Sequence, residues 1–235
     1  WESGEFRVEE FRVPLVDARV VPPKVAPVAP KELAFGVQMN HLSGGVMAQA
    51  HLRATALLKP RATSFASYDG FSFEPPREGG PDPQAQESEA SDGAAQREGK
   101  LIADKLPLMT DKNGAAHLLL KDLPKITRPS EVVAEVTFND PNGEVQTVGA
   151  TVPLWPSAVV LGVKTGSWAS SRGQVKFTGL ALDTAGKPVK SQAVDVRGRL
   201  AQVISTRKRM VGGFYAYDNR TDIKDLGALC SGRTD

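Results

Sequence analysis

The feature that most constrains this chain is a period-two alternation of apolar and polar residues, broken at short intervals by Gly, Pro and Asn. Residues 33–40 show it clearly, and similar stretches occupy 131–138, 144–152, 158–163 and 192–204. Because successive side chains of a strand point to opposite faces of a sheet, this alternation predicts half-buried strands. Asn113-Gly114 and Asn142-Gly143 predict hairpins, since the pair tolerates positive φ. The sequence therefore predicts an all-β chain.

Composition removes several classes of protein. The chain has 29 Lys+Arg against 27 Asp+Glu, whereas nucleic-acid-binding domains carry a clustered basic excess. Its apolar runs are only a few residues long, and a membrane-spanning helix needs roughly 20. Residues 1–7 lack the pattern of a signal peptide and an initiator Met. We therefore expect a fragment of a longer protein.

An internal repeat predicts two domains. An ungapped shift of 142 positions superposes Pro14 on Pro156, Phe35 on Phe177 and Gly44 on Gly186. We expect residues 1–14 to be a linker or the last strand of a preceding domain. Residues 15–153, without an insertion at about 74–100, suit a seven-stranded sandwich of about 100 residues. Residues 158–235 are expected to be a second, incomplete domain, ending at Thr234-Asp235 as if at the turn Thr110-Asp111. The predicted fold is a tandem of immunoglobulin- or fibronectin-III-like antiparallel β-sandwiches.

The insertion at 74–100 has its own composition. It contains no Val, Ile, Leu, Met or aromatic residue, and holds seven acidic against three basic residues. Such a segment buries too little apolar surface to offset the entropy of ordering it. We interpret it as a tolerated surface insertion rather than a cleavable or partner-binding loop, and expect limited proteolysis to cut there first.

No motif predicts catalysis or metal binding. The three histidines, His41, His51 and His117, lack the spacing of a metal-binding pair. A Gly-x-Ser-x-Gly elbow and Gly-rich phosphate loops are missing from the sequence. We therefore predict no catalytic, metal-binding or cofactor-binding residue, no cofactor, and a chain that is not an enzyme.

The remaining candidates favour ordinary surface or packing roles. Asp218, Asp222 and Asp225 lack the spacing of a calcium loop and indicate a solvated loop. The basic triplet 207–209 is typical of a solvated face at a strand end. Cys230, the single cysteine, is expected to be a buried or half-buried thiol.

Several stretches resemble bacterial alpha-2-macroglobulins. Residues 6–14, Phe-Arg-Val-Glu-Glu-Phe-Arg-Val-Pro, resemble the segment between successive macroglobulin-like domains. Leu161-Gly162-Val163 with Trp168, followed by residues 182–189, is similar to the start of the next domain. The most specific stretch is 207–219, Arg-Lys-Arg-Met-Val-Gly-Gly-Phe-Tyr-Ala-Tyr-Asp-Asn. With 226–227 and 230–235 it is similar to the long periplasmic members.

The resemblance implies a function that the residues alone do not reach. Members of the family are multidomain protease inhibitors: a protease cuts a bait segment, the molecule rearranges, and a thioester reacts with the attacker. The resemblance implies structural macroglobulin-like domains of such a broad-spectrum trap, which protects the cell envelope. Its expected partners are trapped proteases, neighbouring macroglobulin-like domains and a class A penicillin-binding protein or other envelope proteins. The expected location is the periplasm, with the parent anchored to the inner membrane as a lipoprotein.

The thioester motif of the family is not present here. That motif is Cys-x-Glu-Gln, whereas Cys230 is followed by Ser-Gly-Arg. No functional residue is therefore carried over from the family to this chain.

Two other functions stay open. One is a partner-binding or adhesive β-sandwich module of a cell-surface protein, with Tyr215, Tyr217 and residues 207–209 as its patch. The other is a carbohydrate-binding accessory domain, although Trp1, Trp155 and Trp168 look more like packing residues than sugar platforms.

Overall fold

The computed structural model describes residues 14–74, 99–166, 176–209 and 215–235. Within these ranges every regular element is a β-strand and no helix occurs, so the expected all-β class is confirmed. None of these segments forms a helix long and apolar enough to cross a bilayer. Residues 1–13 of the expected linker and 75–98 of the expected insertion lie outside the described residues.

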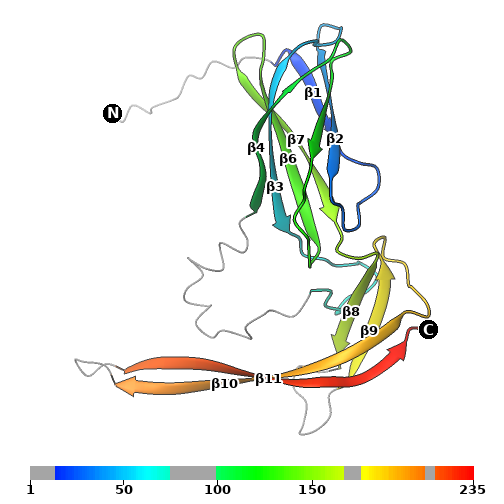
Figure 1. The fold of residues 1–235 in the computed structure, drawn as a ribbon, viewed down its shortest axis with the longest axis vertical. Helices are drawn as coiled ribbons and strands as arrows, with labels where there is room; N and C mark the ends of the chain where they lie inside the picture. The colour runs from blue at the N-terminus through cyan, green and yellow to red at the C-terminus, as the bar shows by residue number, and fades with distance from the viewer. Residues whose placement is uncertain (1–13, 75–98, 167–175, 210–214) are drawn as a thin grey trace, which may run out of the picture.

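Seven strands build a two-sheet sandwich in the first part of the chain (Figure 1). They are β1 (Val16–Val21), β2 (Leu33–His41), β3 (His51–Pro60), β4 (Lys100–Met109), β5 (Ala115–Leu120), β6 (Ser130–Asn139) and β7 (Val145–Leu154). One sheet has the order β1-β2-β5 and the other β4-β3-β6-β7, and all neighbours are antiparallel. The expected stretch at 33–40 becomes β2, and 131–138 with 144–152 become the β6–β7 hairpin.

In the sandwich, the apolar residues of the alternating stretches are buried and the residues between them are more exposed. On β2, Leu33, Phe35, Val37 and Met39 are buried, and the residues between them are more exposed. On β6 every second residue from Ser130 to Phe138 is buried. The two inner faces meet in one apolar cluster, which draws residues from all seven strands of the sandwich. Burial of this cluster supplies the main stabilising free energy of the sandwich.

Three turns of the chain share one sequence, Asp-x-x-Gly. The turns begin at Asp111, Asp140 and Asp183, and each ends on a Gly with φ between 73° and 87°. In each turn the Gly N–H donates to the Asp carbonyl, and the Asp N–H donates to the residue after the Gly. Asn142-Gly143 closes the expected β6–β7 hairpin, whereas Asn113-Gly114 lies in a turn between β4 and β5, which belong to different sheets, so the second expected hairpin is wrong. In both turns only the Gly takes positive φ. The Asn lies inside a longer loop that ends on the left-handed Gly.

Four further strands form the second part. They are β8 (Val159–Thr165), β9 (Phe177–Asp183), β10 (Ala193–Arg209) and β11 (Tyr215–Arg233). β8 pairs with β9, and β10 with β11, as two separate antiparallel pairs. Figure 1 shows β10 and β11 as a long ribbon that extends sideways below the sandwich. β11 is 19 residues long.

The predicted repeat is confirmed by a shared set of hydrogen bonds. In the sandwich the Thr110 hydroxyl donates to Met47 O over 2.7 Å and accepts from Ala50 N over 2.8 Å. In the second part Thr234 makes the same contacts, to Val189 O over 2.6 Å and from Gln192 N over 2.9 Å.

The shift of 142 positions relates the partners of the two threonines. It carries Met47 to Val189 and Ala50 to Gln192. It also carries Gln49, with φ 55°, to Ser191, with φ 56°. The backbone N–H of each of these two residues donates to the carbonyl of the corresponding Thr. β8–β11 therefore repeat the layout of β1–β4, while the boundaries of the two predicted domains stay a prediction.

A candidate functional site at the joint between the two parts

The chain segment after β3 leaves the sandwich and docks on the second part. Backbone Ser72 and Val163 exchange two hydrogen bonds, Ser72 N to Val163 O over 2.8 Å and Val163 N to Ser72 O over 2.9 Å. The Lys164 ammonium donates to Asp69 O over 3.3 Å. Residues 61–74 thus add a short antiparallel bridge to the outer edge of β8, which is otherwise an edge strand.

Aromatic side chains of this segment form a second apolar cluster with β8 and β9. Phe73 is 5% exposed, and it packs with Trp155 and with Leu182, which is fully buried. The rings of Phe65 and Phe73 meet edge to face at 4.9 Å between centroids, the arrangement that aromatic quadrupoles favour. This cluster shares no residue with the sandwich core, so the two parts have separate cores. We call residues 61–74, Trp155 and the β8–β9 hairpin the joint.

Two glycines make the close approach possible. A Cβ on Gly162 would lie 2.5 Å from Cε1 of Phe73, and a Cβ on Gly186 would lie 2.7 Å from Cδ1 of Phe65. Gly186 also has φ 84°, a conformation that side-chain-bearing residues rarely adopt. The backbone of the second part can therefore sit directly against the two phenylalanines.

Trp155 ties the joint back to the sandwich. It follows β7 directly and pairs with the loop between β1 and β2, where Ala29 N donates to Trp155 O over 2.8 Å and Trp155 N donates to Pro27 O over 3.0 Å. The Arg61 guanidinium lies 4.7 Å from the ring centroid of Trp155, in a cation–π contact. The second part is thus held against the sandwich by Trp155 and by residues 61–74.

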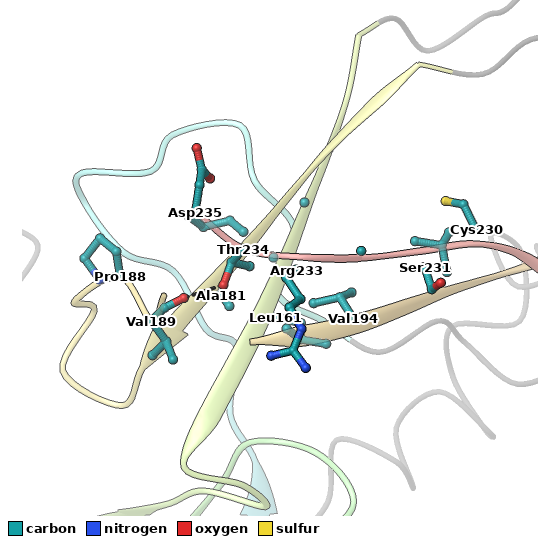
Figure 2. A pocket seen from close by; sticks show the side chains of 15 residues that line it. Leu161, Ala181, Pro188, Val189, Val194, Cys230, Ser231, Arg233, Thr234 and Asp235 are labelled. Carbon is teal, nitrogen blue, oxygen red and sulfur yellow. Dashed lines mark hydrogen bonds between the residues drawn. The ribbon is translucent and has the colours of Figure 1, made fainter. Parts of the chain in front are cut away.

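A shallow cleft lies beside the β8–β9 hairpin, and Gly162 of the joint is among its lining residues. It has a volume of about 290 Å³ and lies between this hairpin and the base of the β10–β11 ribbon. Figure 2 shows apolar side chains of Leu161, Ala181 and Val194 along it, with the Thr234 hydrogen bond to Val189 at one end. Its lining also includes Cys230, Arg233 and Asp235.

The three histidines do not come together. His41 ends β2, His51 begins β3 and His117 lies on β5, and the last two are exposed. Among residues 14–74, 99–166, 176–209 and 215–235, no three His, Cys, Asp or Glu residues are placed to hold a metal ion. The prediction that the chain has no catalytic, metal or cofactor residue stays a prediction.

Two expectations about single residues are wrong. Cys230 is exposed, not buried, because it lies on β11 opposite Val196 where only two strands pair. Asp222 and Asp225 lie on β11 and not in a loop, and Asp222 accepts a hydrogen bond from Arg220 Nε over 2.8 Å. The expected packing role of Trp155 is confirmed, and Trp1 and Trp168 lie outside the described residues.

Sequence reasoning missed the joint, although a signal for it is present. Phe65, Tyr68, Phe71 and Phe73 concentrate four of the chain's aromatic residues in nine positions, directly before the apolar-free insertion. Their spacing fits neither a strand nor a helix period, so periodicity alone does not place them. What the joint can do is mechanical: it fixes the angle between two β units.

Comparisons with known proteins show which structures resemble this arrangement. No protein-family model and no curated protein matches the chain significantly. Solved structures do match. The native conformation of E. coli alpha-2-macroglobulin aligns with TM-score 0.61 and 18% identity over 97% of this chain and 15% of that one. E. coli alpha-2-macroglobulin activated by porcine elastase gives 0.60 and 19%, covering 97% and 20%. A Salmonella alpha-2-macroglobulin gives 0.59 and 16%, covering 97% and 15%.

These likenesses establish the fold. The chain has the β-sandwich fold of macroglobulin domains in bacterial alpha-2-macroglobulins, and the resemblance expected from its sequence is confirmed at that level. It spans only 15% to 20% of the length of the structures it matches.

Proposed function

We propose that this chain is a structural segment of a protease trap of the bacterial alpha-2-macroglobulin type. The observation that carries the proposal is the extent of the likeness, which covers 97% of the chain and therefore both β units with their joint. A single β-sandwich is common to many unrelated proteins. A likeness that spans both units is a more specific feature.

The joint gives this role a mechanism. A trap that responds to cleavage needs parts that keep their spacing until the cut, and the joint fixes one such spacing with a dedicated aromatic cluster. E. coli alpha-2-macroglobulin is activated by porcine elastase, and also by trypsin. We propose that cleavage elsewhere in the parent protein moves this two-unit segment as one body.

Further properties belong to the same proposal. The segment is not an enzyme, and its parent traps proteases and protects the cell envelope. The parent lies in the periplasm as a lipoprotein of the inner membrane, and contacts neighbouring macroglobulin-like domains and a class A penicillin-binding protein or other envelope proteins. The family resemblance supports these properties.

The isolated chain provides the first test. Because the proposed role is passive, residues 1–235 alone should leave the activity of trypsin and elastase unchanged at equimolar concentration. Stoichiometric inhibition of either protease by the chain alone would contradict the proposal.

A chimera provides the positive test. The matched segment of E. coli alpha-2-macroglobulin is replaced by this chain, and the chimera is assayed for its response to elastase. We expect the chimera to be activated, and a chimera carrying Gly162→Val to be impaired because the joint is loosened. A matched chimera with Gly179→Ala, at a position where a Cβ meets nothing within 4 Å, should behave as the parent chimera. Equal responses from the two variants would contradict a role for the joint.

A further inference from the structure

The β10–β11 ribbon is longer than the repeat requires. When β3 is shifted by 142 positions, it superposes on β10 only as far as residue 202. When β4 is aligned on β11 by matching Thr110 to Thr234, the first residue of β4 falls on Lys224. Residues 203–209 and 215–223 therefore have no counterpart in the sandwich. At about 3.4 Å per residue they extend the ribbon by roughly 24 Å.

Completion of the second sandwich would leave this extension uncovered. In the sandwich, β6 covers the free edge of β3 as far as Pro60, whose counterpart is residue 202. A strand in the equivalent place beside β10 would therefore end at residue 202, where the extension begins. The exposure of the extension, residues 203–209 and 215–223, therefore does not follow from strands missing beside the ribbon.

One face of the extension combines arginine and tyrosine. Arg207 pairs across the ladder with Tyr217, and Arg209 with Tyr215. The Arg207 guanidinium carbon lies 3.7 Å from the ring centroid of Tyr215, so the two side chains stack. Tyr215 is 52% exposed and Tyr217 is 60% exposed.

The rest of this face extends the patch with apolar and small polar side chains. Alternation places Val203, Ser205, Asn219, Thr221 and Ile223 on the same side as the tyrosines. Together with Arg207, Arg209, Tyr215 and Tyr217 they form what we call the tyrosine–arginine face. It carries two positive charges and no acidic residue.

The opposite face of the ribbon differs in charge. There Arg220 forms an ion pair with Asp222 at 2.8 Å, so part of its positive charge is neutralised. Within the described residues Arg207 and Arg209 form no ion pair, and Arg and Tyr are both residue types enriched at interface hot spots.

We propose that the tyrosine–arginine face docks an acidic, apolar segment of a partner protein. Carboxylates of the partner pair with Arg207 and Arg209, and its apolar side chains pack on the exposed rings of Tyr215 and Tyr217. A two-stranded ribbon has marginal stability alone, so a partner on this face also stabilises the ribbon. A protein partner is favoured over a nucleic acid because two arginines neutralise too few phosphates for substantial affinity. The inference is independent of the proposed function.

The test uses the full chain and a defined probe. A fluorescein-labelled peptide of alternating glutamate and leucine is titrated with residues 1–235, and binding is followed by fluorescence anisotropy at low and physiological salt. We expect saturable binding that weakens with salt. Tyr217→Ala and Arg207→Ala should each weaken it about fivefold or more, the usual loss at a hot spot.

Matched variants separate docking from folding. Tyr217→Phe keeps the ring, and Arg220→Ala alters the opposite face, so both should bind within about twofold of the original chain. Hydrogen exchange of β10 and β11 shows that each variant retains the ribbon. A peptide of alternating lysine and leucine should not bind.

Three outcomes overturn the proposal. The first is no binding of the acidic peptide. The second is equal weakening by Arg220→Ala and Arg207→Ala. The third is binding to vesicles of phosphatidylglycerol without binding to the acidic peptide, which would assign the face to a membrane surface instead.

Discussion

Gly162 shows how much of the joint depends on one missing side chain. Its Cα lies against the ring of Phe73, and the nearest ring carbon is 2.5 Å from where a Cβ would stand. The ring is 5% exposed and packed on several sides, so it has little room to move. Any larger residue at position 162 must displace either the ring or β8.

We therefore predict that Gly162→Val loosens the joint. Overpacking of this kind costs about 1–3 kcal/mol, and the loss should fall on the β8–β9 hairpin. Hydrogen exchange measured by mass spectrometry should show faster exchange in β8 and β9 and unchanged exchange in β2 and β6. Gly179→Ala, with open space around the new Cβ, is the control. Equal protection of β8 in Gly162→Val and the original chain would contradict this.

A second prediction at this scale concerns Asp111. Its Oδ1 accepts backbone hydrogen bonds from Ala115 N over 2.9 Å and from Asn113 N over 2.8 Å. These bonds favour the carboxylate and lower the pKa of Asp111 below its ordinary value. Because the pKa in the folded state is the lower one, the turn is stabilised at neutral pH. That stabilisation begins to be lost when the pH falls to about 4, the ordinary pKa of Asp, and it is lost completely once the pH is below the pKa of the folded state.

Carboxyl resonances in NMR spectra measure this pKa directly. We expect the Asp111 carboxyl to titrate below the range of an unperturbed aspartate. Asp111→Asn should remove the dependence of the β4–β5 turn on acidic pH. A titration midpoint at or above the ordinary Asp value would contradict the assignment.

Among the elements, the repeated turn around Thr110 and Thr234 is the clearest sign of common construction. Each Thr hydroxyl donates to one backbone carbonyl and accepts from one backbone N–H of the preceding turn. Thr110 is 1% exposed, so water cannot replace its hydrogen bonds. The same pair of threonine hydrogen bonds therefore holds the end of β4 and the end of β11 in place.

The two threonines should differ in what they stabilise. Thr110→Val leaves Met47 O and Ala50 N without their side-chain partner in a buried site, which costs about 1–3 kcal/mol. It should lower the melting temperature of the sandwich, measured by circular dichroism. Thr234→Val should leave that transition unchanged and speed hydrogen exchange only at Ser191 and Gln192. A lower melting temperature of the sandwich in Thr234→Val would show that the two units are not separately stabilised.

At the scale of the whole molecule, two separate cores are held together by residues 61–74 and by Trp155. The sandwich core and the joint cluster share no residue, and residues 61–74 connect them. This arrangement makes the angle between the units depend on the joint cluster rather than on a broad interface.

Phe73→Ala should therefore change shape without unfolding the sandwich. Removal of a buried Phe side chain costs about 3–5 kcal/mol, enough to release the segment from β8. Small-angle X-ray scattering should show a larger radius of gyration, while the melting temperature of the sandwich stays the same. Phe35→Ala, in the sandwich core, should lower that melting temperature instead. An unchanged radius of gyration for Phe73→Ala would mean that other contacts hold the two units.

The sequence by itself determined the strands and the repeat. Alternation at 33–40 and 131–138 fixes which side chains are buried, because a strand presents successive side chains to opposite faces. The 142-residue shift predicts which turns correspond, and Gly186 takes positive φ as Gly44 does. These features depend on near neighbours in the chain, so a local pattern records them.

Only the tertiary structure decided the joint, the exposure of Cys230 and the composition of the tyrosine–arginine face. Phe73 and Gly162 are far apart in sequence, and nothing in either neighbourhood shows that they touch. Cys230 is exposed because only one strand pairs beside it, and Arg207 reaches Tyr215 because β10 and β11 pair in one particular register. Contacts between distant segments depend on how the strands pair and pack, and a period-two pattern carries no information about which strands will meet.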